Sequence, residues 1–331
     1  PWKTAQMNKT DKSQNQAEPG VSSGSVAIVG AGLIGRGWAI VFARAGWQVK
    51  LYDLDVGALD VAKKEIANQL QMLVSHGLGS SPDLIIQKIH FESDLATALT
   101  DVGYVQECGP EVLDVKQALF SELDRLSAPH AILASSTSGF MASEFAAHLS
   151  GRHRVLVVHP VNPPHLVPLV EISPAKWTDP DITQTAHQIM SAVKQTPITV
   201  QKEIPGFILN RLQGALLNEA LRLVQGGYVT PQDVDKTMRD GLGLRWSFMG
   251  PFETIDLNAP AGLADYAQRY GKMYHVMAAS QSTPPDWDKS SVAGIDATRR
   301  KVLKRDDIGQ RQDWRDNRLA ALVAHKSKQE N

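Results

Sequence analysis

Three closely spaced glycines follow a short apolar segment, Val-Ala-Ile-Val, near the start of the chain. They are Gly30, Gly32 and Gly35, and Leu33 and Ile34 stand between the last two. In a strand–turn–helix unit, such glycines permit a tight turn, the close approach of a pyrophosphate and close packing of the helix on the sheet. The first turn of the helix then offers free N–H groups to phosphate oxygens. The pattern predicts a dinucleotide-binding site.

An acidic residue stands where a dinucleotide site needs one. Asp53 comes 23 residues after Gly30, at the end of a second apolar segment. A carboxylate at this strand end binds both hydroxyls of a ribose, and it repels a 2′-phosphate. The sequence therefore predicts that NAD is preferred over NADP.

A histidine and a glutamate lie on neighbouring apolar segments. His159 ends the run Val-Leu-Val-Val, and Glu171 follows 12 residues later, after a proline-rich turn. If the two segments pair as strands, the side chains can meet. A carboxylate then holds the imidazole in one tautomer and stabilises its protonated form, which suits a base that removes a hydroxyl proton. The alternative is a buried pair without a catalytic function.

Three further polar residues are candidates for holding a substrate. Ser138 follows the predicted strand at 131–135, Asn210 lies at the start of a long predicted helix, and Arg245 lies in a glycine-rich stretch. Ser138 and Asn210 suit a substrate oxygen, and Arg245 can pair with a carboxylate in bidentate fashion. The alternatives are an N-cap for Ser138, an exposed position for Asn210 and a structural salt bridge for Arg245. No metal site is predicted.

The elements that must position these residues alternate between strand and helix patterns. This alternation predicts a Rossmann-type, doubly wound α/β fold with a mostly parallel sheet. The short, proline-rich connection after His159 predicts that the two strands beside it run antiparallel. The expected strands are 25–30, 48–53, 87–91, 103–107, 131–135, 154–159, 167–172 and 197–201, and the main helices are 33–46, 56–77, 112–126 and 180–195.

The pattern changes near Pro205. Residues 206–226 form an amphipathic helical pattern, a second helix is expected to begin with Thr230 as its cap and Pro231 in its first turn, and no further strand is indicated. We therefore expect an NAD-binding domain at 25–204 and an all-helical domain at 205–331. Residues 1–24 are polar and are expected to be a disordered extension, with residues 1–6, ahead of Met7, as a cloning remnant.

Composition limits the function classes. The chain has 34 basic and 35 acidic side chains, so nothing in its charge favours nucleic acid or an anionic membrane as a partner. No apolar run approaches the roughly 20 residues that span a bilayer. The single cysteine, Cys108, permits no internal disulfide and suits a reducing compartment. With no recognisable leader, we expect a cytoplasmic protein.

Taken in order, the motifs resemble those of the 3-hydroxyacyl-CoA dehydrogenase family. They are GAGLIG, the aspartate at 53, QECGPEVLDVK, SSTSG, HPVNPP with PLVE, and GFILNRL, and they cover residues 25 to about 270. The resemblance implies that His159 and Glu171 are a catalytic pair assisted by Ser138 and Asn210. It also implies a homodimer formed through the C-terminal helices. Two more residues, Glu111 and Lys116, are implied to border the nicotinamide.

Within this family, HPVNPP, DGLGLRW and GPFETIDLNA are most similar to the lambda-crystallin and L-gulonate 3-dehydrogenase branch. The substrates of that branch are free hydroxy acids, which gives Arg245 a carboxylate to bind. The chain departs from the branch at His165 and Leu166, where aromatic residues are usual. We expect NAD-dependent oxidation of the 3-hydroxyl of a small free acid similar to L-gulonate.

Three alternatives remain open from the sequence. SSTSG and LRWSFMG also resemble L-carnitine dehydrogenase, for which Trp246 and Phe248 would supply an aromatic cage. A 3-hydroxyacyl-CoA dehydrogenase, acting for example on 3-hydroxybutyryl-CoA, would need a phosphate site, and Lys63 and Lys64 form a weak candidate. A catalytically silent, crystallin-like protein would keep the fold without the activity.

Overall fold

The computed structural model describes residues 24–79 and 81–329, which form two compact units. The first unit contains the described residues up to Phe207 together with those from Leu319 onward, and the second contains Ile208–Arg318. The extension expected at 1–24 lies outside the described residues except for Gly24. No helix among the described residues is long and apolar enough to cross a membrane.

The first unit is built on one eight-stranded sheet with the order β3-β2-β1-β4-β5-β6-β7-β8. All neighbours pair in parallel except β6 and β7, which are antiparallel. The Rossmann-type fold class and the antiparallel pair are thus confirmed. The strands are β1 (Ser25–Val29), β2 (Gln48–Tyr52), β3 (Ile89–Glu92), β4 (Tyr104–Glu107), β5 (Ile132–Ser135), β6 (Val155–Pro160), β7 (Leu169–Pro174) and β8 (Thr196–Thr199).

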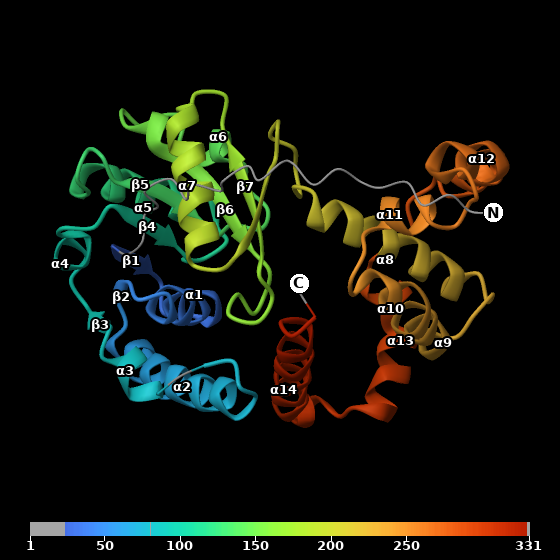
Figure 1. Ribbon diagram of the computed structural model, residues 1–331, viewed down its shortest axis with the longest axis horizontal. Coiled ribbons are helices and arrows are strands. Elements are labelled where there is room, and N and C mark those ends of the chain that lie inside the picture. Colours follow the sequence, from blue (N-terminus) through green and yellow to red (C-terminus); the bar gives the residue numbers. More distant parts are fainter. Residues whose placement is uncertain (1–23, 80, 330–331) are drawn as a thin grey trace, which may run out of the picture. The chain divides into compact units, whose positions relative to one another are not determined.

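Helices cover both faces of this sheet (Figure 1). Alternate residues of β1 belong to separate cores, with Val26 and Ile28 on one face and Ala27 and Val29 on the other. This is the alternation of a strand that is buried on both sides. The helices of the unit are α1 (Leu33–Arg44), α2 (Val56–Ser75), α3 (Pro82–Ile86), α4 (Leu95–Leu99), α5 (Leu113–Leu126), α6 (Ala142–Phe145) and α7 (Pro180–Ala192).

An aromatic cluster fixes α1 against the sheet. The ring of Phe42 lies 5.9 Å from Trp38, 5.2 Å from Trp47 and 5.7 Å from Tyr104, centroid to centroid. All four side chains are almost fully buried. Aromatic pairs at these separations add to the stabilisation from burial. The second half of α1 is therefore packed against the first residue of β4.

The second unit is helical throughout its described residues. It contains α8 (Leu209–Gln225), α9 (Pro231–Lys236), α10 (Gly243–Trp246), α11 (Pro251–Asp256), α12 (Gly262–Ser280), α13 (Lys289–Val302) and the first part of α14 (Ile308–Lys326), with a π-helical turn at Thr237–Leu242. The Thr230 cap of α9 is confirmed, because the Asp233 N–H donates to its hydroxyl at 3.2 Å.

Two details differ from the sequence expectations. The long helix begins at Leu209 rather than at residue 206, because Gly206 and Phe207 have φ values of 79° and 48°. Residues in the left-handed region do not continue a right-handed helix. The end of α14, from Leu319, packs with the first unit, where Ala320 is fully buried. The sequence had placed this whole tail in the helical domain.

Candidate active site

The glycine loop between β1 and α1 has the geometry of a dinucleotide cradle. Gly30 has a φ of 111°, and a Cβ there would lie 2.6 Å from the carbonyl oxygen of Cys108. A Cβ on Gly35 would lie 1.8 Å from the carbonyl oxygen of Gly30. At Gly32, in contrast, a Cβ would meet no atom within 4 Å. The first and third glycines are required by the fold, and the second keeps open the space where a pyrophosphate approaches.

These glycines give a matched pair of variants. Gly35→Ala should destabilise the fold by about 1–3 kcal/mol, because the added methyl group collides with backbone. Gly32→Ala should leave the thermal midpoint unchanged but weaken NAD binding, because its methyl group enters only the ligand's space. Thermal unfolding and NADH-fluorescence titration separate the two effects. A stable Gly35→Ala protein, or unaltered NADH affinity in Gly32→Ala, would contradict this assignment.

The carboxylate of Asp53 lies at the end of β2 and faces the glycine loop. Its Oδ2 accepts a hydrogen bond from the Ala31 N–H at 2.8 Å, and its Oδ1 accepts one from the Asp55 N–H at 3.0 Å. The acid is thus held beside the loop that would bind the phosphates. This is the position from which a carboxylate reaches a ribose.

We predict that Asp53→Ala erodes the preference for NAD over NADP. Removing the carboxylate removes both the ribose contact and the repulsion of a 2′-phosphate. The ratio of kcat/KM for NAD to kcat/KM for NADP measures the effect, and Asp55→Ala is the control at the neighbouring acid. The same ratio in wild type and Asp53→Ala would count against the ribose contact.

The imidazole of His159 and the carboxylate of Glu171 meet across the antiparallel strands β6 and β7. The two residues are direct partners in the strand register, and Nδ1 of His159 lies 2.8 Å from Oε2 of Glu171. His159 is 5% exposed and Glu171 is fully buried. Since a carboxylate only accepts, Nδ1–H donates, and Nε2 then carries the lone pair. The ring of Phe207 lies 5.4 Å from the imidazole.

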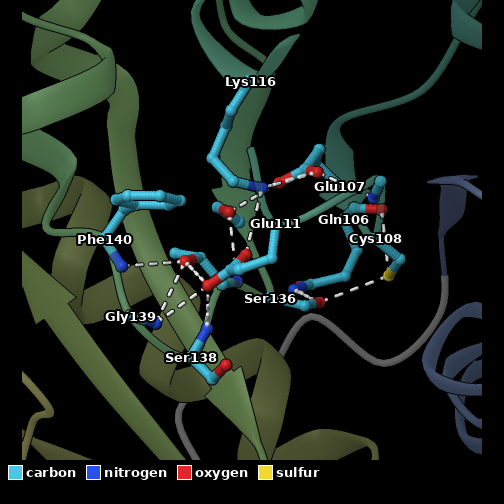
Figure 2. Close-up of polar contacts among 12 residues, drawn as sticks. Gln106, Glu107, Cys108, Glu111, Lys116, Ser136, Ser138, Gly139 and Phe140 are labelled. Carbon is cyan, nitrogen blue, oxygen red and sulfur yellow. Dashed lines mark hydrogen bonds and ion pairs between the residues drawn. The ribbon is translucent and has the colours of Figure 1, made fainter. Parts of the chain in front are cut away.

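Glu111 organises the turn that carries Ser138. Its Oε1 accepts hydrogen bonds from the Thr137 hydroxyl at 2.6 Å, the Ser138 N–H at 3.0 Å and the Gly139 N–H at 2.9 Å. Figure 2 shows this carboxylate against the backbone of the turn, with the Ser138 side chain extending away from it. Ser138 is therefore positioned by its main chain, and Glu111 has a positioning role besides its implied place near the nicotinamide.

Lys116 forms a buried ion pair with Glu107. Its Nζ lies 2.9 and 2.8 Å from the two oxygens of Glu107 and 3.8 Å from Oε2 of Glu111 (Figure 2). Lys116 and Glu107 are each 1% exposed. Glu107 also accepts from the Ser135 hydroxyl and the Gly109 N–H. Glu107 was not among the residues predicted from the sequence, although a glutamate at the end of a buried strand pattern is a signal in itself.

A second polar network joins α1 to the strands behind the site. The Ser136 hydroxyl accepts from Trp38 Nε1 at 3.1 Å and from Gln106 Nε2 at 2.7 Å, and it lies 3.2 Å from Sγ of Cys108. Gln106 also donates to the carbonyl oxygen of Val158, next to His159. Burial raises the pKa of the Cys108 thiol, so Cys108 is a neutral packing residue rather than a nucleophile.

A small cavity brings several predicted residues together. It has a volume of 190 Å³ and lies beside the glycine loop and the Ser138 turn. Its lining includes Ile34, Glu111, Lys116 and Ser138. Leu33, the remaining cofactor candidate, begins α1 and is 53% exposed.

The other candidates from the sequence lie in the second unit or on the surface. Asn210 is the second residue of α8, and Arg245 lies in α10, where its charge acts on the nearby Tyr266 phenol. Trp246 and Phe248 are 40% and 72% exposed. The remaining pair, Lys63 and Lys64, is exposed on α2.

Together, the dinucleotide cradle and the Rossmann-type sheet define an NAD-binding domain of the kind that dehydrogenases carry. The chain belongs to the 3-hydroxyacyl-CoA dehydrogenase family: the NAD binding domain of that family matches residues 25–204, and its C-terminal domain matches residues 206–301.

Individual relatives carry several different names. The chain is 39% identical to lambda-crystallin of Oryctolagus cuniculus, over 91% of this chain and 96% of that protein. It is 35% identical to L-carnitine dehydrogenase of a Pseudomonas species, over 90% of this chain and 92% of that protein. Its structure is similar to that of an NAD-dependent 5-formyl-3-hydroxy-2-methylpyridine 4-carboxylic acid 5-dehydrogenase, with a TM-score of 0.78, 26% identity and coverage of 90% and 96%.

Proposed function

We propose that the protein oxidises the 3-hydroxyl of a small free hydroxy acid, L-gulonate or a similar sugar acid, to the 3-keto acid. The observation that carries this proposal is the buried His159–Glu171 pair, in a domain that matches the NAD-binding family. Two of the similar proteins are named for carnitine and for a pyridine carboxylic acid, which are both free acids. Another similar protein, 34% identical, is named 3-hydroxyacyl-CoA dehydrogenase, so the substrate panel below includes a CoA ester.

In the proposed mechanism, Nε2 of His159 takes the proton of the 3-hydroxyl group while a hydride leaves C3, the carbon that bears this hydroxyl. When bound, NAD would supply the acceptor for that hydride. Glu171 keeps the proton on Nδ1, so that Nε2 is the basic nitrogen, and its charge stabilises the imidazolium that forms. Burial of the pair strengthens this electrostatic interaction, because water does not screen it.

Substrate positioning is assigned to three residues. Ser138 and Asn210 would donate hydrogen bonds to the reacting oxygen, and Arg245 would bind the carboxylate. A free 3-hydroxy acid has a carboxylate close to its 3-hydroxyl, to which the arginine can bind. A CoA ester has no carboxylate at that position, because its carboxyl group is a thioester. Arg245→Ala should therefore raise KM for a free acid far more than KM for a CoA ester.

Formation of NADH, followed by absorbance with a panel of substrates, tests the function. The panel contains L-gulonate, 3-hydroxybutyrate, L-carnitine and 3-hydroxybutyryl-CoA. We expect kcat/KM to be highest for L-gulonate. A higher value for L-carnitine or for the CoA ester would replace the proposed substrate by that alternative. An absence of turnover with the whole panel, despite NADH binding, would favour the catalytically silent protein.

We also propose a homodimer formed through the second unit. Its longest helices leave large apolar side chains uncovered: α8 buries only Leu221, while Leu212, Leu216 and Leu217 are 64%, 37% and 40% exposed. An exposed apolar face of this kind is typical of an interface between subunits. A second copy of the chain is the occupant we propose, and the molecular mass from sedimentation velocity checks it.

A further inference from the structure

A second cavity lies in the first unit, apart from the residues of the candidate active site. It is formed by the C-terminal half of α1, the loop between β6 and β7, the turn between α7 and β8, and the last turns of α14. Its volume of 390 Å³ falls in the range of small-molecule sites. None of the glycine-loop residues or catalytic candidates lines it. Its walls are partly apolar, with Val41, Leu166, Val193 and Val323 among them.

The charged residues of this cavity all have the same sign. Arg44, Lys194 and Lys326 line it, and no aspartate or glutamate is among its lining residues. His165 also lines it, and burial together with the charge of Arg44 lowers the pKa of His165 to about 4. The imidazole is therefore neutral at physiological pH. Three cations at one partly apolar cavity favour an anionic ligand.

Lys194 has a backbone conformation that usually selects glycine. Its φ is 62°, and it follows the last turn of α7. The Lys194 N–H donates to the carbonyl oxygen of Ser191, and the Gln195 N–H donates to that of Met190, as in a Schellman motif. Lysine is strained at this position, whereas glycine is not. The side chain of Lys194 is thus present where the fold alone would favour glycine.

Two polar atoms of lining residues lack a protein partner within the described chain. They are Oε1 of Gln195 and Nδ1 of His165, and both are buried. The other ring nitrogen of His165 is held by Gln69 at 3.2 Å. A buried polar atom without a hydrogen bond is costly. Because Gln69 Oε1 accepts from the Nε2–H of His165, both unpartnered atoms are acceptors, and an anion, which only accepts, would be held by the cations and not by these two atoms.

We propose that this cavity binds a small organic anion with a compact apolar body. Arg44, Lys194 and Lys326 would bind its charged group, and the apolar walls would cover its body. Nothing in this assignment depends on the substrate of the His159 site.

Isothermal titration calorimetry with hexanoate tests the proposal, and NADH is added at saturation to occupy the dinucleotide site. Hexanamide is the neutral comparison, and inorganic phosphate supplies charge without an apolar body. Hexanoate should bind about tenfold more tightly than hexanamide, because three weak charge contacts combine. It should also bind more tightly than phosphate. Equal affinity for hexanoate and hexanamide, or no saturation by hexanoate below about 10 mM, would overturn the proposal.

Variants assign the binding to this cavity. Lys194→Gly should weaken hexanoate binding about threefold without lowering the thermal midpoint, because glycine suits the backbone better. Lys326→Gln should have a similar effect on binding. The control is Lys202→Gln, which removes one positive charge from an exposed lysine outside the cavity. It should leave hexanoate binding unaltered. Unchanged affinity in both cavity variants would refute the site.

Discussion

Replacing His159 by alanine is expected to lower kcat by about 10²–10⁴-fold and to leave the affinity for NADH nearly unchanged. The reduction is the usual contribution of a general base, and the dinucleotide cradle lies on other strands. Steady-state assays with the best substrate of the panel, together with fluorescence titration of NADH, measure both quantities.

The matched control is His153→Ala, since His153 is an exposed histidine of the same unit. It should keep full activity. Because His159→Ala removes the imidazole that bonds the buried Glu171, the variant's circular dichroism spectrum must match wild type before its rate is compared. A folded His159→Ala protein with a nearly normal kcat would show that another group takes the proton.

The largest expected effect on stability concerns the buried ion pair of Glu107 and Lys116. Lys116→Met should lower the free energy of unfolding of the first unit by about 3–5 kcal/mol, because it leaves the Glu107 carboxylate buried and uncompensated. The double variant Lys116→Met/Glu107→Gln should regain most of this loss, since neither remaining group is charged. Urea-induced unfolding of wild type, Lys116→Met and the double variant measures these differences in the free energy of unfolding.

Arg125→Met supplies the exposed comparison for this pair. Arg125 bonds Glu122 on the surface of α5, with 63% and 51% of the side chains exposed. Solvent screens such pairs, so little change in stability is expected. If Lys116→Met were as stable as Arg125→Met, the buried pair would not contribute to the fold as described.

The sequence predicted the sheet well because its signals are local. Each expected strand is present, with ends that differ by at most two residues, since apolar β-branched runs mark buried strands directly. The cross-strand contact of His159 and Glu171 also followed from a local pattern, because a short turn between two strands makes them pair as a hairpin.

What the sequence did not reveal depends on contacts between distant segments. The buried pair of Glu107 and Lys116 joins the end of β4 to α5, and the Ser136 hydroxyl joins Trp38 of α1 to Gln106 of β4. No spacing rule predicts such partners. The packing of Ala320 with the first unit was missed for the same reason, although Leu319, Ala320 and Val323 form a short apolar stripe in a charged helix.

A double-variant cycle of His159→Ala and Glu171→Gln tests the central claim most directly. If Glu171 acts on the reaction only through the imidazole, it has no further effect once the imidazole is gone. The account predicts that kcat of the double variant lies within about threefold of kcat of His159→Ala. The opposite result would be a kcat of the double variant that is reduced by the product of the two single-variant factors. That result would contradict the account.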